Sequence, residues 1–452
     1  LGQLQQSLAD NGSPAVRDAV RAGRLGSVFG NIGGPAVANE LQRVAVEESR
    51  LGIPLLIGFD VIHGYQTTFP VPLAQASSFD PAVAVTDATV AAAEAASAGI
   101  RWTFAPMVDV TREPRWGRIV EGYGEDPYLA SVFAAEKVRG YQGDDYGAPG
   151  RIAACAKHFV AYGGAEGGRD YNTVDVSERR LQDVYLPPFH AAVRAGVATL
   201  MAGFNTISGV PAHANRHTLT EILKQEWGFD GFVVSDYTGV AELIAHGVAA
   251  DLPDAGRLAL GAGVDMEMVS TAFLGHGQDL ISQGLLRMAR VDDAVRRILR
   301  VKFRAGLFDR PYVDLGAEVT EPAPADRAKA RAVAARSMVL VKNAGPVLPL
   351  SREPGSIAVI GPLGDDTSAP HGAWSGPGAG RFPAVSVLAG IRAAVPAATV
   401  GFAQGTTISG TDTGGFAPAL AAAAAASVVV AVVGESSDLS GEGGSRSDIG
   451  LP

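Results

Sequence analysis

Residues 231–236 (GFVVSD) form a short apolar run that ends in a carboxylate, and runs of this form decide the fold. Residues 53–60 (IPLLIGFD) and 151–158 (RIAACAKH) repeat the pattern, and Ala-rich segments with helical spacing, such as 88–98, lie between such runs. Near-continuous apolar strands that alternate with helices predict a parallel sheet buried on both faces. Four more apolar runs begin near residues 26, 101, 198 and 263.

Each of the three quoted runs ends in ionisable side chains: Asp60, the pair Lys157 and His158, and Asp236. Core packing does not explain charged groups at three strand ends. In a (β/α)8 barrel the C-terminal ends of the strands converge on the active site. Seven strands can be counted and an eighth cannot, so we predict an irregular (β/α)8 TIM-like barrel over residues 1–309.

A second α/β pattern follows the barrel. Residues 310–325 (RPYVDLGAEVTEPAPA) are rich in turn-forming residues and predict a linker. Residues 326–452 then predict an α/β sandwich domain, with a helix followed by three strands in the runs MVLVKN (338–343), IAVIG (357–361) and SVVVAVVG (427–434). A parallel sheet of three strands is small, so we expect this second domain to be incomplete in the chain.

Taken one at a time, the ionisable residues at the strand ends have two interpretations. Asp60 and Asp236 suit a carboxylate held on a rigid strand, and equally an N-cap for the next helical turn. Lys157 and His158 suit a pair of hydrogen-bond donors for a ligand, and equally a lysine that extends to solvent beside a satisfied core histidine. The single segments leave these alternatives open.

Charge and apolar patterning exclude several classes of partner. The formal net charge is −10 and no Lys/Arg-rich block is present, so we expect no nucleic-acid partner. The longest apolar stretch, 419–434, predicts a helix followed by a buried strand, and we expect no membrane partner. Cys155 is the only cysteine, which rules out an intrachain disulfide and a site built from several cysteines.

The start of the chain bears on its cellular compartment. The first residue is Leu1, and no signal-peptide pattern is visible. We therefore expect a trimmed start, with any export signal already removed. A periplasmic or secreted location and a cytoplasmic one both stay open.

Seven segments together resemble the family 3 glycoside hydrolases, in particular the bacterial β-glucosidases and their plant exo-β-glucanase relatives. The resemblance extends in order from the early strands to the last one and so covers essentially the whole chain. It rests on GFDVIHG (58–64), FAPMVDVTREPRWGR (104–118) with GEDPYL (124–129), KHFVAYGGAEGGRDYNTVD (157–175), GFVVSDY (231–237), VDDAVRRILRVKFRAGLFDRPY (291–312) and VLVKNAGPVLPL (339–350).

The resemblance implies a role for each strand-end residue. Asp236 would be the catalytic nucleophile, while Asp60, Arg118, Lys157 and His158 would bind hydroxyl groups of the terminal sugar. Three further positions would line the sugar site: Phe204, where many relatives have Tyr; Tyr237, which replaces a frequent Trp; and Trp374, which would approach from the second domain.

The resemblance also implies an acid/base glutamate on a loop of the second domain. The segment 427–452 offers Glu435, Asp438, Glu442 and Asp448. The family pattern of Glu followed four positions later by Arg matches Glu442 and Arg446. Glycines flank Glu442 and would let the loop approach a ligand closely. We therefore predict Glu442 as the acid/base and a structural or orienting role for Glu435.

The resemblance implies a retaining, exo-acting β-glycosidase, with β-glucosidase as the expected activity. Two carboxylates suffice for double displacement, so we expect no metal and no cofactor. The expected partner is a small oligosaccharide or β-glucoside, and a homodimer stays open. An N-acetylhexosaminidase is less favoured, because no second His follows His158 before His190.

Two unrelated classes are alternatives to an enzyme of this kind. Residues 357–366 (IAVIGPLGDD) suggest nucleotide binding, but they lack the G-x-G-x-x-G fingerprint at the start of a helix. A non-catalytic sugar-binding module would keep the hydroxyl donors and lose the chemistry. Both candidate catalytic carboxylates are present here, which favours the enzyme.

Overall fold

Eight parallel strands form the larger part of the molecule. The computed structural model describes residues 1–345, 347–353 and 355–452. In the large sheet the order is β4-β3-β2-β1-β10-β9-β6-β5. Bridges from Trp102 to Ala153 and from Met107 to Lys157 join the two outer strands, so the sheet closes into a barrel. The strands are β1 (Gln5–Leu8), β2 (Ser27–Phe29), β3 (Leu56–Phe59), β4 (Trp102–Thr103), β5 (Cys155–Phe159), β6 (Thr199–Ala202), β9 (Phe232–Tyr237) and β10 (Met266–Met268).

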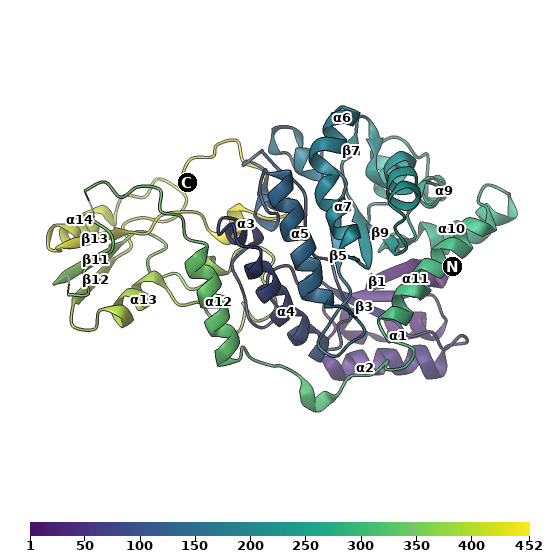
Figure 1. Ribbon diagram of the computed structural model, residues 1–452, viewed down its shortest axis with the longest axis horizontal. Helices are drawn as coiled ribbons and strands as arrows, with labels where there is room; N and C mark the ends of the chain where they lie inside the picture. Colours follow the sequence, from purple (N-terminus) through teal and green to yellow (C-terminus); the bar gives the residue numbers. More distant parts are fainter. Residues whose placement is uncertain (346, 354) are drawn as a thin grey trace.

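Helices surround this sheet, and the predicted (β/α)8 TIM-like barrel is confirmed (Figure 1). Helix α5 begins at Pro127 because the Asp126 side chain accepts a hydrogen bond from the backbone N–H of Leu129 and caps it. The helices are α1 (Pro14–Arg21), α2 (Pro35–Arg43), α3 (Pro72–Ala76), α4 (Ala82–Ser97), α5 (Pro127–Gln142), α6 (Glu178–Arg180), α7 (Pro187–Arg194), α8 (Glu242–Ala245), α9 (Leu252–Ala262), α10 (Ala272–Ser282) and α11 (Met288–Arg304).

The strand that the apolar pattern missed is β1. Its sequence, QQSL, is polar, although Gln5 and Gln6 are buried. The Gln5 side-chain amide donates to the Ser270 carbonyl at 2.8 Å, and that of Gln6 donates to Ser27 Oγ at 2.8 Å. These contacts pair the two side-chain amide nitrogens, which would otherwise be costly to bury, whereas the two amide oxygens accept no hydrogen bond from the described residues. A barrel strand whose buried side chains are glutamines has no apolar run, so the apolar pattern predicts seven strands and the structure has an eighth.

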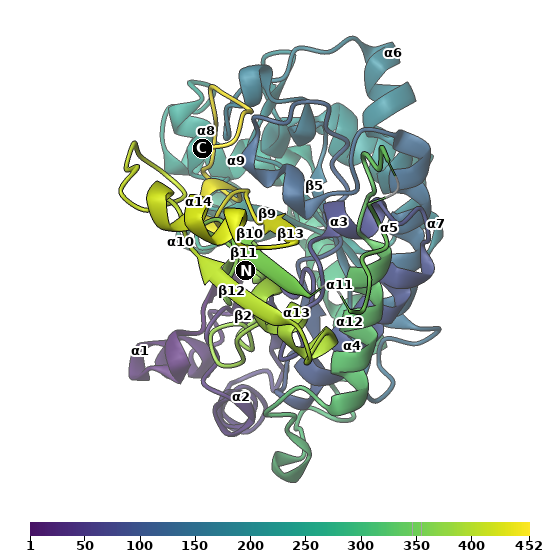
Figure 2. The same cartoon turned by 90° about the vertical axis from the view of Figure 1, so that its left-hand side faces the viewer.

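The second part contains a smaller parallel sheet in the order β12-β11-β13 (Figure 2). It comprises β11 (Ser356–Ile360), β12 (Thr399–Ala403) and β13 (Val428–Ala431), with helices α13 (Val387–Ala394) and α14 (Phe416–Ala424). The predictions of strands in 357–361 and 427–434 are confirmed. The bounds predicted for the domains and the linker stay predictions.

The predicted strand at 338–343 is wrong, and β12 takes the place beside β11. The segment 338–343 has no strand geometry, and the side chains of Met338 and Val341 are 78% and 89% exposed. The backbone partners of β11 are β12 on one side and β13 on the other, so no place next to β11 is left for a further strand. The preceding helix, α12 (Pro324–Arg336), packs against α3 and α4 on the outside of the barrel.

Residues 372–378 of the second part lie against a barrel loop. The backbone N–H of Gly378 donates to the Tyr65 carbonyl at 3.0 Å, and His63 Nε2 lies 2.7 Å from the Ala373 carbonyl oxygen. A Cβ atom at Gly376 would lie only 2.4 Å from the Tyr65 carbonyl oxygen, so the close approach requires glycine there. This contact places the second part beside the carboxyl ends of the barrel strands.

Candidate active site

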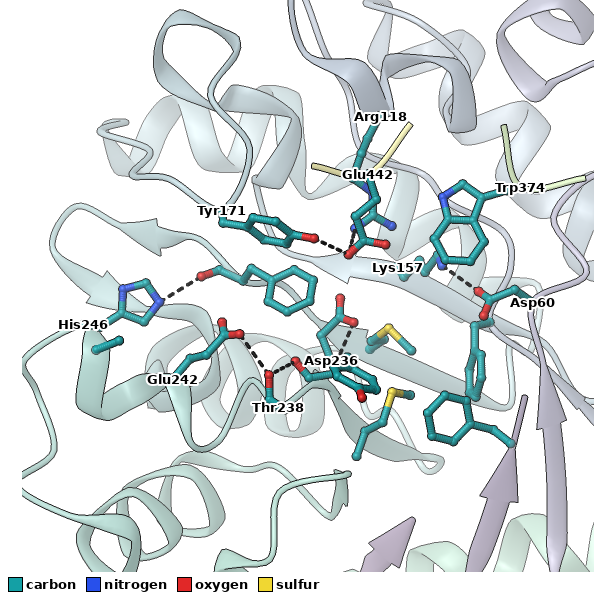
Figure 3. Close-up of a pocket in the computed structure, with 17 residues that line it drawn as sticks. Asp60, Arg118, Lys157, Tyr171, Asp236, Thr238, Glu242, His246, Trp374 and Glu442 are labelled. Atoms are coloured by element: carbon teal, nitrogen blue, oxygen red, sulfur yellow. Dashed lines mark hydrogen bonds and ion pairs between the residues drawn. The ribbon is translucent and has the colours of Figure 1, made fainter. Parts of the chain in front are cut away.

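A cavity of about 680 Å³ opens at the carboxyl ends of the barrel strands, a volume typical of small-molecule sites. Residues of both parts line it (Figure 3). Eight of the nine predicted site residues are among its lining residues: Asp60, Arg118, Lys157, Phe204, Asp236, Tyr237, Trp374 and Glu442. The ninth, His158, lies directly behind Asp236.

Asp236 lies at the end of β9 and faces the cavity with a side chain that is almost fully buried. Its Oδ1 accepts a hydrogen bond from the backbone N–H of Tyr237 at 2.8 Å, whereas no hydrogen bond reaches Oδ2 from the described residues. Its own backbone N–H donates to His213 Nε2 at 3.0 Å. One carboxylate oxygen is therefore held by a hydrogen bond, and the other is buried without a hydrogen-bond partner among the described residues.

Burial raises the pKa of the Asp236 carboxyl, and the nearby charge of Glu442 raises it further. The cations of Arg118 and Lys157 act in the opposite direction and favour the ionised form. The balance between burial and these two cations therefore controls how readily Asp236 loses its proton.

His158 is a neutral imidazole that lies between three ionisable side chains. Burial lowers the pKa of the imidazole well below its usual value, and the neighbouring charge of Arg118 adds to the effect. Its Nδ1–H donates to Asp109 Oδ2 at 2.8 Å, so Nε2 is left to accept from Arg118 Nη2 at 2.9 Å. Nε2 lies 3.6 Å from Asp236 Oδ2 and carries no proton to donate.

Arg118 is a buried cation held between two carboxylates. Its Nε and Nη2 donate to Glu121 at 2.8 and 3.1 Å, which fixes the plane of the guanidinium group. Its Nη1 lies 3.2 Å from Glu442 Oε1. Burial alone would lower the pKa of Arg118, but the charges of Glu121 and Glu442 outweigh burial, and the group stays charged.

Lys157, Asp60 and Trp374 form one end of the cavity (Figure 3). The Lys157 ammonium donates to Asp60 Oδ1 at 3.0 Å and lies 5.3 Å from the centre of the Trp374 ring. Burial would lower the pKa of Lys157, yet the charges of Asp60 and Glu121 raise it. This end of the cavity thus presents an ammonium group, a carboxylate and an aromatic face.

Glu442 reaches the cavity from the second part of the chain, opposite Asp236 (Figure 3). Its Oε1 accepts a hydrogen bond from the Tyr171 hydroxyl at 2.8 Å and contacts Arg118. Glu435, which also follows β13, instead forms an ion pair with Arg446. The loop therefore turns Glu442 inward while Glu435 pairs within the loop.

The Glu442 loop is held by backbone pairing with the barrel. Gly117 N–H donates to the Gly444 carbonyl at 2.8 Å, and Gly441 N–H donates to the Gly117 carbonyl at 2.7 Å. Arg446 N–H donates to the Arg115 carbonyl at 3.0 Å. A Cβ atom at Gly117 would lie 2.4 Å from the Gly441 carbonyl oxygen, which is closer than real Cβ contacts allow.

Phe204 and Tyr237 shape the wall near Asp236. Phe204 is buried and packs edge-on against Tyr171, with ring centres 4.9 Å apart. Tyr237 is partly exposed and packs edge-on against Phe29 at 6.4 Å. Both positions were assigned to the site from the resemblance, and both line the cavity.

The assignment from sequence missed several residues that contact the site. Tyr171 lies within the quoted segment 157–175, so the resemblance gave a signal for it, yet a tyrosine in a loop has no pattern of its own. Glu242 also lines the cavity, accepts a hydrogen bond from the Thr238 hydroxyl at 3.0 Å, and has its pKa raised by burial. Asp109 accepts a hydrogen bond from His158, and Glu121 accepts one from Arg118, so both hold site residues in place without lining the cavity.

Comparisons with known proteins match both parts of the chain. The model of the glycosyl hydrolase family 3 N-terminal domain matches residues 1–301, and that of the family 3 C-terminal domain matches residues 338–452. Among the described residues, no helix is long and apolar enough to cross a membrane.

Among curated proteins, a periplasmic beta-glucosidase of Salmonella typhimurium is 40% identical over 98% of the chain, and a beta-xylosidase of Formosa agariphila is 36% identical over 91%. The structure of a beta-glucosidase from Listeria innocua in complex with glucose covers the whole chain with a TM-score of 0.92 at 36% identity. The chain spans 61% of the length of each of the two curated relatives and 64% of the solved one.

We predict that Gly117→Ala separates the Glu442 loop from the barrel, because the added methyl group occupies the space of the Gly441 carbonyl oxygen. Hydrogen exchange of peptides that cover residues 440–447 should accelerate about tenfold or more as backbone hydrogen bonds open. Gly261→Ala is the matched control, because no atom lies within 4 Å of a Cβ placed there. Unchanged exchange in the Gly117 variant would contradict this account of the loop.

Proposed function

The chain belongs to glycosyl hydrolase family 3, and on this premise we propose that it is a retaining, exo-acting β-glucosidase. It removes the non-reducing terminal β-D-glucosyl residue of oligosaccharides or glucosides. One observation carries the proposal: Asp236 from the barrel and Glu442 from the second part line the same cavity. Two carboxyl groups that flank one bond are what double displacement at a sugar requires.

In the first step, Glu442 donates a proton to the glycosidic oxygen while Asp236 attacks the anomeric carbon. The bond from the anomeric carbon to that oxygen breaks, the leaving alcohol departs, and a covalent glycosyl–Asp236 ester remains. Asp236 suits the attack because its carboxylate lines the cavity from a rigid strand end and accepts a single hydrogen bond from the described residues. Arg118 and Lys157 favour the ionised form of Asp236 and offset part of the effect of burial, which raises the pKa of this carboxyl to about 8.

In the second step, Glu442 acts as a base. It removes a proton from a water molecule, which attacks the anomeric carbon and releases the sugar and the Asp236 carboxylate. Each step inverts the anomeric carbon, so the product keeps the β configuration. The partly exposed position of Glu442, beside Tyr171 and at the edge of the second part, lets water reach it.

The terminal sugar binds at the end of the cavity formed by Asp60, Lys157 and Trp374. An ammonium group and a carboxylate that pair at 3.0 Å can exchange part of that contact for sugar hydroxyls, and the indole offers a flat apolar face. Arg118 and His158 supply further polar contacts beside Asp236. A cluster of this kind at one end of the cavity supports exo action.

Two relatives bear on the choice of sugar and on location. One is named a beta-glucosidase and another a beta-xylosidase, so both sugars occur among proteins similar to this chain. We favour glucose because the Asp60 carboxylate, at its strand end, suits the 4- and 6-hydroxyl groups of glucose. The periplasmic relative supports a periplasmic location.

A panel of p-nitrophenyl β-glycosides that differ only in the sugar tests the specificity. We expect kcat/KM for the glucoside to exceed that for the xyloside by more than about tenfold, because a site built to bind a hydroxyl group discriminates against a sugar that lacks it. Asp60→Ala should narrow this ratio. A higher kcat/KM for the xyloside would assign a β-xylosidase instead.

Glu442→Ala tests the acid/base role through the leaving group. Loss of general acid catalysis should lower kcat/KM for cellobiose by roughly 10²–10⁴-fold. The rate of the first step with 2,4-dinitrophenyl β-glucoside should change little, because its leaving group needs no proton. Because azide needs no general base, it should restore turnover of the dinitrophenyl substrate and yield a β-glucosyl azide. Equal loss on both substrates without azide rescue would place the acid on another carboxyl group.

Proton NMR of the wild-type reaction supplies the stereochemical control. The β-anomer of glucose should form first and mutarotate later. Initial release of the α-anomer would contradict the retaining mechanism while leaving the glucosidase activity itself in place.

A further inference from the structure

Asp170 lies on the barrel loop that follows β5, outside the residues given a role above. Three hydrogen-bond donors converge on its carboxylate. Trp116 Nε1 donates to Oδ1 at 2.8 Å, and the Tyr162 hydroxyl donates to the same oxygen. The third donor comes from the second part of the chain: the backbone N–H of Gly443 donates to Oδ2 at 2.8 Å.

The backbone of Asp170 contacts the same loop a second time. Its N–H donates to Ser445 Oγ at 3.0 Å. The two contacts therefore hold Gly443 and Ser445, which lie one and three residues after Glu442. The next barrel residue, Tyr171, donates its hydroxyl to the Glu442 carboxylate. Asp170 thus holds the backbone of the loop while Tyr171 holds the side chain that the loop presents.

The barrel side of this contact is rigid. Trp116 and Tyr162 are fully buried, and their rings pack edge-on with centres 5.1 Å apart. Hydrogen bonds to an ionised carboxylate are stronger than those between neutral groups. The loop side is flexible by composition, since Gly443 and Gly444 have no side chains and Gly443 has a φ of 76°. Together with the backbone pairing at Gly117, a rigid carboxylate that contacts this glycine-rich loop fixes where the loop lies.

We propose that Asp170 is a positioning residue that sets the reach of Glu442 toward the glycosidic oxygen. The inference rests on the proposed function, because it assumes that Glu442 acts as the acid/base. Asp170 itself touches no reacting atom. It acts by fixing Gly443 and Ser445, and a shift of the loop by about 1 Å is enough to cost roughly 10²-fold in a proton-transfer step.

Asp170→Asn is a sharp test, because it keeps the size of the side chain and removes one acceptor. If the amide nitrogen faces Gly443, two donors meet and the contact with the loop is lost. If the amide turns over, its nitrogen faces the Trp116 indole N–H, and that pairing is lost instead. Either orientation breaks the chain of hydrogen bonds from Trp116 to the loop.

The experiment compares wild type, Asp170→Asn, Glu442→Ala and Asp175→Asn on cellobiose and on 2,4-dinitrophenyl β-glucoside. Asp175 is a matched control: it belongs to the same barrel loop, is exposed, and makes no side-chain hydrogen bond or ion pair within the described ranges. We expect Asp170→Asn to lower kcat/KM on cellobiose by about 10–100-fold. On the dinitrophenyl substrate the first step should stay within about threefold of wild type, and azide should accelerate turnover, as in Glu442→Ala.

Several results would overturn the proposal. Wild-type rates on both substrates would show that Asp170 does not fix the loop, and equal losses on both without azide rescue would show a merely structural role. If Asp170→Asn fails to fold, Ser445→Ala removes the second contact, and the absence of any selective loss on cellobiose would count equally against it. Failure of the proposed function is recognised separately, because Glu442→Ala would then show no dependence on the leaving group.

Discussion

The pairing of one backbone residue of the barrel with a loop from the second part of the chain completes the site. Gly117 both donates to Gly444 and accepts from Gly441, and this two-sided contact brings Glu442 to the cavity. A carboxylate on the barrel and a carboxylate on a loop of the second part line one cavity where this contact forms. The contact needs a residue without Cβ at its centre, and that residue, Gly117, is not among those that line the cavity.

The same loop contact brings the Glu442 carboxylate to the Arg118 cation inside the cavity. Arg118 donates hydrogen bonds to Glu121 and His158 and forms an ion pair with Glu442. The cation that favours ionisation of Asp236 therefore also contacts the loop from the second part. Lys157 is paired with Asp60 at the far end. His158 lies between Arg118 and Asp236 and is neutral, so it adds no charge to the site. Burial raises the pKa of Asp236, and the two paired cations limit how far.

The sequence predicts those features of the molecule that depend on residues close together in the chain. The strand-end positions of Asp60, Lys157 and Asp236 follow from apolar runs that stop at a charge, and the cavity contains all three. The apolar pattern does not predict strand β1, because its buried side chains are glutamines that form hydrogen bonds. It does not predict β12 either, because the five residues of β12 include Gly401 and contain no sustained apolar run. Contacts between distant loops, such as Tyr171 with Glu442, depend on how two domains meet, which no local pattern encodes.

We propose above that Asp236 forms a covalent bond to the sugar, and trapping that bond tests the proposal most directly. In 2,4-dinitrophenyl 2-deoxy-2-fluoro-β-glucoside the fluorine slows both steps by destabilising the oxocarbenium-like transition state, while the good leaving group keeps the first step the faster one. The account predicts a stoichiometric fluoroglucosyl adduct that peptide mapping by mass spectrometry places on Asp236. An adduct on Glu242, Glu442 or another carboxyl group, or steady hydrolysis without any adduct, would contradict it.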